Sequence, residues 1–168
     1  MNSLDSAAWA RIDALKCELA SEVLRSSGTL RLGVTGWSML PTVWPGDTLV
    51  IERVGSEGVS EDDIVLFGRH RRLFAHRVVA KRGNSNDQVI HTQGDGMFRP
   101  DEPMRDSELL GRVSSILRNG KRLNPRLMNS SERVIAALVR RFDSFARLAV
   151  RLHEMRQSQQ EQIAPCQN

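Results

Sequence analysis

The chain has 168 residues, which suits one domain with a helical addition and allows a modest hydrophobic core. A hydrophobic fraction of 40% and a charged fraction of 26% are ordinary for a soluble globular protein, and no stretch reaches the roughly twenty apolar residues of a membrane-spanning helix. The charged N-terminal region predicts no secretory signal, and the two cysteines, Cys17 and Cys166, fit neither a disulfide framework nor a metal site. We therefore expect a cytoplasmic protein without a metal or other cofactor.

The formal net charge of +4 is unevenly distributed along the chain. Basic residues, nearly all of them arginine, far outnumber acidic ones between Gly111 and Arg156. Such a segment is found in proteins that contact anionic membranes or nucleic acids, and also on solvated helix faces. We expect the solvated face here, and no nucleic-acid partner.

The first predicted element is a helix over residues 3–24, inside an N-terminal segment of residues 1–28. Apolar residues recur there in steps of three and four, which is the pattern of an amphipathic helix. They are Leu4, Ala8, Ile12, Leu15, Leu19 and Val23. The run Ser26-Ser27-Gly28 follows as a typical helix end.

Residues 29–124 are predicted to form a mainly β domain. Leu30, Leu32 and Val34 alternate with Arg31 and Gly33, which is the period of a strand. Further strands are expected at residues 48–53, 63–67, 73–81, 88–92 and 110–117, with turn-forming residues between them. Residues 119–120, Asn-Gly, have the sequence of a type I′ turn and predict a hairpin between residues 116–118 and 121–123.

Beyond residue 124 the spacing becomes helical again, and an Arg-rich amphipathic helix is predicted over residues 125–156. Its apolar residues follow a heptad-like seam. They are Ile135, Leu138, Phe142, Phe145, Ala149 and Leu152. We expect this seam to pack on the domain, on the N-terminal helix or on a second copy of the chain, and a peripheral membrane contact is the alternative. The polar residues 157–168 are predicted to be disordered.

Four residues have the side chains that a serine hydrolase needs. Ser38 lies in a tight segment bounded by glycine and proline, His76 lies in a predicted strand, and Asp95 and Asp101 follow in a turn-rich segment. A serine hydroxyl becomes a nucleophile when a base takes its proton, and a carboxylate behind a histidine fixes the useful tautomer. Asp95, which stands between two glycines, fits a simple turn residue as well.

The sequence around these residues resembles the superfamily of signal peptidases and self-cleaving repressors. The similar segments follow one another in the family's order between Leu32 and Leu117. They are residues 36–42 with 46–47 around the nucleophile, 61–67 as the second strand, 76–79 around the base, 94–101 with the acidic residues, and 110–113 as the closing strand. In the second segment Asp62 replaces the glycine of the family's usual Gly-Asp-Ile-Val. Bacterial signal peptidases and the repressors use lysine as the base, so His76 makes the chain similar to the archaeal and endoplasmic-reticulum branch.

The resemblance implies a coiled β-sheet catalytic domain, flanked here by the two predicted amphipathic helices. It implies Ser38 as the nucleophile and His76 as the general base, with Asp95 and Asp101 as candidate supporting carboxylates and a slight preference for Asp101 beside His76. The Ser38 backbone N–H is the expected oxyanion donor, and the second donor stays open because Gly36 replaces a hydroxyl residue of many relatives. The residues expected to contact substrate are Gly36, Trp37, Met39 and Pro41.

We therefore expect a serine endopeptidase that cleaves a peptide or precursor protein bound in extended form along a sheet edge. A catalytically inactive peptide-binding module of the same fold is the alternative. A self-cleaving repressor fits less well, because the region before the first strand is too short for a DNA-binding domain and the sequence has no Ala-Gly or Cys-Gly dipeptide for self-cleavage.

Overall fold

The computed structural model describes residues 3–83 and 88–125. Helix α1 (Ser3–Ser27) precedes the strands β1 (Thr29–Gly33), β2 (Thr48–Glu52), β3 (Ile64–Arg69), β4 (Arg72–Arg82), β5 (Val89–Gln93), β6 (Leu109–Arg118) and β7 (Lys121–Leu123). Two short 3-10 turns, η1 (Ser56–Gly58) and η2 (Asp106–Glu108), lie between strands. The prediction of a mainly β protein that begins with a helix is confirmed. The expected C-terminal helix and polar tail lie, apart from Pro125, outside the described residues.

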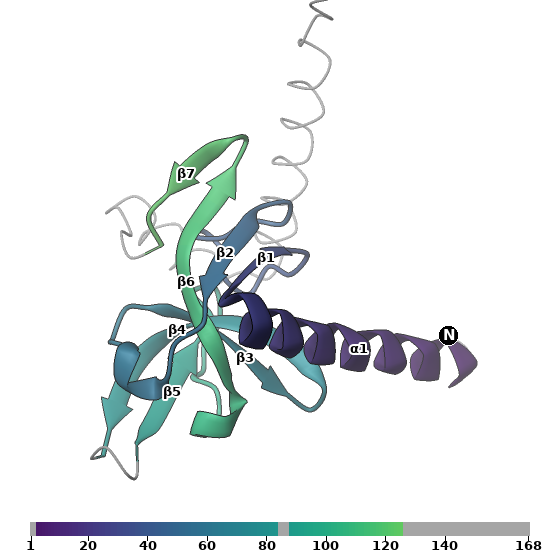
Figure 1. Ribbon diagram of the computed structural model, residues 1–168, viewed down its shortest axis with the longest axis horizontal. Coiled ribbons are helices and arrows are strands. Elements are labelled where there is room, and N and C mark those ends of the chain that lie inside the picture. Colours follow the sequence, from purple (N-terminus) through teal and green to yellow (C-terminus); the bar gives the residue numbers. More distant parts are fainter. Residues whose placement is uncertain (1–2, 84–87, 126–168) are drawn as a thin grey trace, which may run out of the picture.

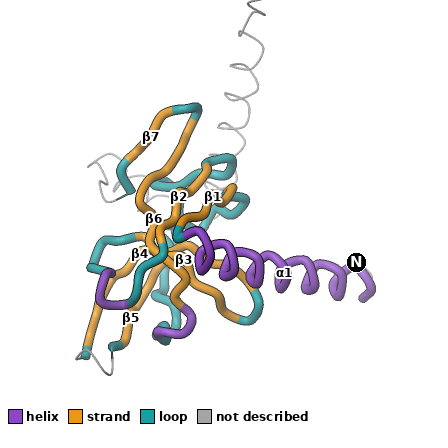
Figure 2. Tube along the Cα trace, viewed as in Figure 1, coloured by secondary structure: helices purple, strands orange, loops and turns teal. Residues whose placement is uncertain are grey.

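The strands form one antiparallel sheet in the order β1-β2-β6-β3-β4-β5, with β7 paired to β6 (Figures 1 and 2). The late strand β6 thus lies between β2 and β3 and joins the first part of the chain to the middle part. The register shifts at β2–β6, β3–β6 and β4–β5. Bulges of this kind bend strands and increase their twist, so the sheet is curved.

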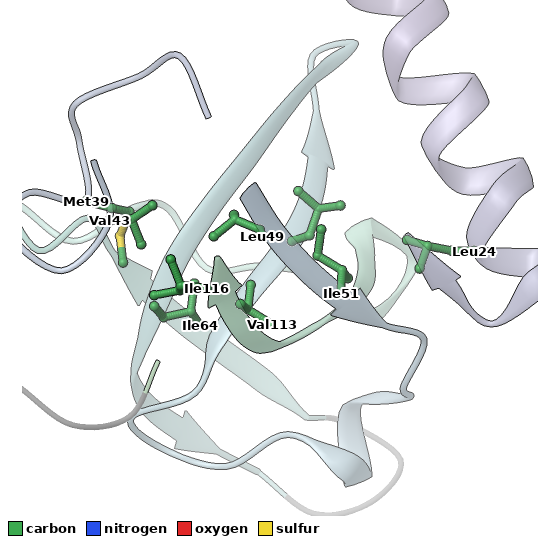
Figure 3. Packing of buried hydrophobic residues seen from close by; sticks show 9 residues of the cluster. Leu24, Met39, Val43, Leu49, Ile51, Ile64, Val113 and Ile116 are labelled. Atoms are coloured by element: carbon green, nitrogen blue, oxygen red, sulfur yellow. The ribbon is translucent and has the colours of Figure 1, made fainter. Parts of the chain in front are cut away.

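Strand β3 is buried on both faces and separates two apolar clusters. Its alternate residues Ile64 and Leu66 belong to one cluster, and Val65 and Phe67 belong to the other. Successive side chains of a strand point to opposite faces, which explains why this central strand is a continuous apolar run. Figure 3 shows the first cluster, in which residues of the sheet lie between Leu24 of α1 and the residues of the β1–β2 loop.

Helix α1 packs on the sheet through a face other than its apolar stripe. Ala20 and Leu24 are buried, and Cys17 Sγ approaches β3 so closely that a Cβ on Gly68 would lie 2.8 Å from it. The residues of the expected apolar face that the structure describes are exposed by 38–56%: Ile12, Leu15, Leu19 and Val23. Figure 1 shows α1 running outward from the sheet, and no described helix is long and apolar enough to cross a membrane. The sequence period therefore located the helix but not the face that packs.

Two predicted chain reversals use left-handed backbone conformations. Gly28 ends α1 with a φ of 73°, and its N–H donates to the Leu24 carbonyl at 3.1 Å. Asn119 and Gly120 have φ values of 49° and 73° between β6 and β7. A type I′ turn requires positive φ at both central residues, so the predicted hairpin is confirmed.

Candidate active site

Ser38 lies in the loop between β1 and β2, where a tight turn begins. Leu40 N–H donates to the Trp37 carbonyl at 3.1 Å, and Val43 N–H donates to the Met39 carbonyl at 2.9 Å. Met39 and Leu40 are 4% and 0% exposed, so the turn is anchored in the core directly after Ser38. This anchoring leaves Ser38 half-buried at the surface of the turn.

His76 approaches Ser38 from strand β4. It pairs with Val65 of β3, is 5% exposed, and has the rings of Phe67 and Phe74 at centroid distances of 6.0 Å. Its Nε2 lies 3.0 Å from Ser38 Oγ, which is hydrogen-bond distance. A hydroxyl in contact with a largely buried imidazole is the arrangement that activates a serine nucleophile.

Asp101 occupies the other ring nitrogen of His76. Its Oδ2 lies 2.7 Å from His76 Nδ1 and accepts a hydrogen bond from Thr92 Oγ1 at 2.7 Å. A carboxylate oxygen only accepts, so Nδ1 carries the hydrogen of a neutral His76 and Nε2 is left to accept one from Ser38. Burial raises the pKa of Asp101, but the hydrogen bonds from His76 and Thr92 and nearby positive charge outweigh it, and the pKa lies below its ordinary value.

Arg69 braces the segment that carries Asp101. Its guanidinium donates to the carbonyls of Glu102 and Pro103, both at 3.0 Å, and makes a bidentate contact with Glu108 at 2.8 and 2.9 Å. Hydrogen bonding to Arg69 lowers the pKa of the Glu108 carboxyl to about 2. These contacts fix the chain directly after Asp101, so the carboxylate beside His76 stands on a supported backbone.

Asp95 pairs with Arg77, whereas the carboxylate beside His76 is that of Asp101. Arg77 Nε and Nη2 donate to the two carboxylate oxygens of Asp95 at 2.8 Å each, and these side chains are 9% and 5% exposed. Thr42 Oγ1 donates to Asp95 Oδ2 at 2.5 Å. Asp95 therefore ties the turn after the serine to β4, while the structure places Asp101 beside His76.

The carbonyl of Ser38 lies against the backbone of residues 94–96. Gly96 N–H donates to this carbonyl at 2.8 Å. A Cβ on Gly94 would lie 2.6 Å from the Ser38 oxygen and 2.8 Å from Met97 Cγ, closer than real Cβ atoms come. Only glycine leaves room for the backbone of Ser38 at this point.

We expect Gly94→Ala to slow the reaction of Ser38 with a serine-directed probe by about 10²-fold, because the added methyl group displaces the backbone of Ser38. The free energy of unfolding should fall by about 1–3 kcal/mol, as for other overpacked sites. Labelling kinetics and denaturant unfolding measure the two effects. Gly33→Ala is the matched control, since nothing lies within 4 Å of its added Cβ; equal behaviour of the two variants would contradict the prediction.

The residues predicted to contact substrate divide into two pairs. Gly36 and Trp37 are exposed, whereas Met39 and Pro41 are buried. Met39 belongs to the apolar cluster of Figure 3, and the Pro41 carbonyl accepts a hydrogen bond from Trp44 Nε1 at 2.6 Å. Of these four residues, Trp37 has an exposed side chain, whereas Met39 and Pro41 hold the turn in the core.

Three polar residues of the site were not predicted: Thr42, Arg77 and Thr92. Thr42 and Thr92 are common strand and turn residues whose partners lie 53 and 9 residues away in the chain. Their roles depend on contacts that periodicity does not reveal. Arg77 had one sequence signal, its place beside His76 within the same motif.

No group of three or more His, Cys, Asp and Glu side chains in the described part of the chain is arranged to hold a metal ion. Protein-family models, curated proteins and solved structures give no match to this chain.

Proposed function

We propose that this protein is a serine endopeptidase that hydrolyses a peptide or precursor protein. Ser38 is the nucleophile, His76 the general base and Asp101 the carboxylate that orients His76. The observation that carries the proposal is the continuous series of contacts, 3.0 Å from Ser38 Oγ to His76 Nε2 and 2.7 Å from His76 Nδ1 to Asp101 Oδ2. The resemblance of the motifs to the histidine-type signal peptidases supports the same roles. The curved β-sheet fits the coiled β-sheet that this resemblance implies.

The proposed reaction passes through an acyl-enzyme. Ser38 Oγ attacks the carbonyl carbon while His76 Nε2 takes the hydroxyl proton, and the imidazolium is stabilised by the Asp101 carboxylate. The C–N bond then breaks as His76 returns the proton to the departing amine. Water, deprotonated by His76, attacks the acyl ester, and His76 returns this proton to Ser38 Oγ as the ester C–O bond breaks and the carboxylic acid product leaves.

The negative oxygen of the intermediate needs a hydrogen-bond donor. No group in the described part of the chain accepts a hydrogen bond from the Ser38 backbone N–H. A donor without an internal acceptor next to the attacking oxygen fits an oxyanion site. This N–H is therefore the donor that we assign.

The outer edge of β1 is the proposed docking strand for the substrate backbone. The other end of the sheet is covered, because the carbonyls of Ile90 and Thr92 in β5 accept hydrogen bonds from Met104 and Asp101 at 2.8 Å each. Strand β1 is the opposite edge of the sheet, and the chain runs from it directly into the loop of Ser38. An extended peptide can add to such an edge through main-chain hydrogen bonds.

The ladder between β1 and β2 determines which groups face that edge. Val34 N–H donates to Asp47 at 2.8 Å, and the Gly28 carbonyl accepts from Arg53 at 2.8 Å. Even-numbered residues of β1 therefore bond to β2, and the N–H of Arg31 is directed to the open edge.

We expect Arg31→Pro to lower kcat/KM for a cleaved peptide by about tenfold, the effect of one lost hydrogen bond. Proline removes the outward N–H and leaves the β2 ladder intact, as edge strands allow. Arg31→Ala is the matched control that removes the side chain and keeps the N–H. If the two variants cleave equally well, the substrate does not pair with this part of β1.

The enzymatic proposal is tested with a fluorophosphonate probe. Ser38 Oγ attacks phosphorus, its proton passes to His76 and fluoride leaves, so an active serine acquires a stable adduct. Mass spectrometry should find the adduct on Ser38 of the wild type and none on Ser38→Ala. A wild type that is neither labelled nor able to cleave any peptide of a defined library overturns the proposal in favour of a peptide-binding module.

A further inference from the structure

Three large apolar side chains are exposed on the segments that meet at Ser38. Trp37, directly before the nucleophile, is 45% exposed, and Met97 and Phe98, which follow the Gly-Asp-Gly turn, are 39% and 72% exposed. None of them belongs to either apolar cluster of the core. We call these three residues the apolar rim.

Hydrogen bonds join the two backbone segments that carry the rim residues. Gly96 N–H donates to the Ser38 carbonyl at 2.8 Å and so joins the two segments. The Ser38 oxygen and Met97 Cγ both lie within 2.8 Å of the point where a Gly94 Cβ would sit. The Met97 backbone is fixed as well, because its N–H donates to Gly94 at 2.9 Å and its carbonyl accepts from Gln93 Nε2 at 2.7 Å.

The two carboxylates beside the rim are already paired. Asp95 is turned inward to Arg77, and Asp101 contacts His76. Neither carboxylate is placed to attract a basic side chain of a ligand. The surface beside the nucleophile is therefore apolar and stands on a fixed backbone. A ligand that covers it with an apolar group removes apolar area from water, which favours binding.

We propose that Trp37, Met97 and Phe98 form a subsite that binds a large apolar side chain of the peptide substrate close to the cleaved bond. This inference rests on the proposed function, because the rim is assigned to the substrate by its continuity with Ser38. The substrate class is then a peptide or unfolded segment with a Leu, Met, Phe or Trp side chain within a few residues of the bond that Ser38 attacks.

The test is a cleavage profile on a defined peptide library, read by mass spectrometry for the wild type, Ser38→Ala, and the double variant Met97→Gln with Phe98→Gln. Large apolar residues should be enriched at one position near the bonds that the wild type cleaves and Ser38→Ala does not. For one such peptide and its alanine counterpart, the wild type should prefer the apolar residue in kcat/KM by about tenfold or more, the usual discrimination of an apolar pocket. The double variant should lose most of this preference. Leu19→Gln removes an apolar side chain of similar exposure on α1 and should keep it.

The outcomes separate the two proposals. If neither cleavage nor fluorophosphonate labelling depends on Ser38, the peptidase assignment fails. If cleavage depends on Ser38 but has no apolar preference, or if the double variant keeps the preference, the rim assignment alone is overturned. Sedimentation with phosphatidylglycerol vesicles that the double variant abolishes, together with an unchanged cleavage profile, would assign the rim to a lipid surface and also overturn it.

Discussion

Asp101→Ala is expected to slow the reaction of Ser38 with a fluorophosphonate on the order of 10⁴-fold, as loss of the carboxylate does in characterised serine peptidases. Asp101 Oδ2 holds His76 Nδ1 at 2.7 Å, and without it the imidazole loses both its fixed tautomer and the charge that stabilises its protonated form. Stopped-flow or gel-based labelling kinetics measure the rate. Asp101→Asn keeps the side-chain volume and lacks the charge, so its rate should also fall well below that of the wild type.

The matched control for this variant is Asp106→Ala. Asp106 is an exposed carboxylate on η2, and its loss should leave the labelling rate unchanged. Circular dichroism and denaturant unfolding then establish whether Asp101→Ala is folded. A folded Asp101→Ala that reacts within tenfold of the wild-type rate would show that His76 needs no carboxylate, and the triad mechanism would be wrong.

The depressed pKa of Asp101 gives this prediction a pH dependence. A carboxyl whose pKa is lower in the folded protein than its ordinary value of 3.8 stabilises the fold above that pH, and the contribution disappears as the pH falls through the folded-state pKa. The difference in unfolding free energy between wild type and Asp101→Asn should therefore shrink as the pH falls below about 4, where the Asp101 carboxylate takes up a proton. A difference that stays undiminished well below pH 4 would contradict the assigned hydrogen bonds.

The β-rich architecture follows from local patterns. The strands predicted from apolar runs and the turn-forming residues between them lie within two residues of the observed bounds, and Asn119-Gly120 specified its hairpin because few other residues adopt two successive positive φ values. The packing of α1 was not predictable in this way. The periodic apolar residues of α1 give a clearer sequence signal than the small residues Cys17 and Ala20. The helix nevertheless packs through the small residues, because only they allow its close approach to Gly68.

The site was predictable where a motif surrounds each residue. Ser38, His76 and Asp101 come from three motifs and meet in the structure, although 63 residues of chain separate the first from the last. The sequence favoured Asp101 over Asp95 only slightly, because both are acidic residues of one segment. Which of them meets His76 depends on the path of the chain along β5, where Asp101 N–H bonds to the Thr92 carbonyl at 2.8 Å.

Asp95→Ala is expected to lower the free energy of unfolding by about 3–5 kcal/mol, the usual effect of removing one partner of a buried ion pair. The Arg77 guanidinium would keep its bonds to the carbonyls of Asp62 and Pro125 at 2.8 and 3.1 Å, but no carboxylate would remain to balance its charge. Thr42 would lose its acceptor at the same time. Thermal and urea unfolding measure the change, and the melting temperature should fall by about 10 °C or more.

A second variant separates the pair interaction from the loss of a side chain. Arg77→Met combined with Asp95→Leu removes both charges and keeps apolar volume, and such exchanges are often close to neutral. The double variant should therefore be more stable than Asp95→Ala, with a coupling energy of about 1–3 kcal/mol in the complete cycle of single and double variants.

Labelling of Ser38 adds an independent readout. The pair connects the serine turn to the strand of His76, so variants that lose the pair should also react more slowly with the probe. Additive stability effects with full labelling would mean that the serine turn is held by the core residues Met39 and Leu40 alone.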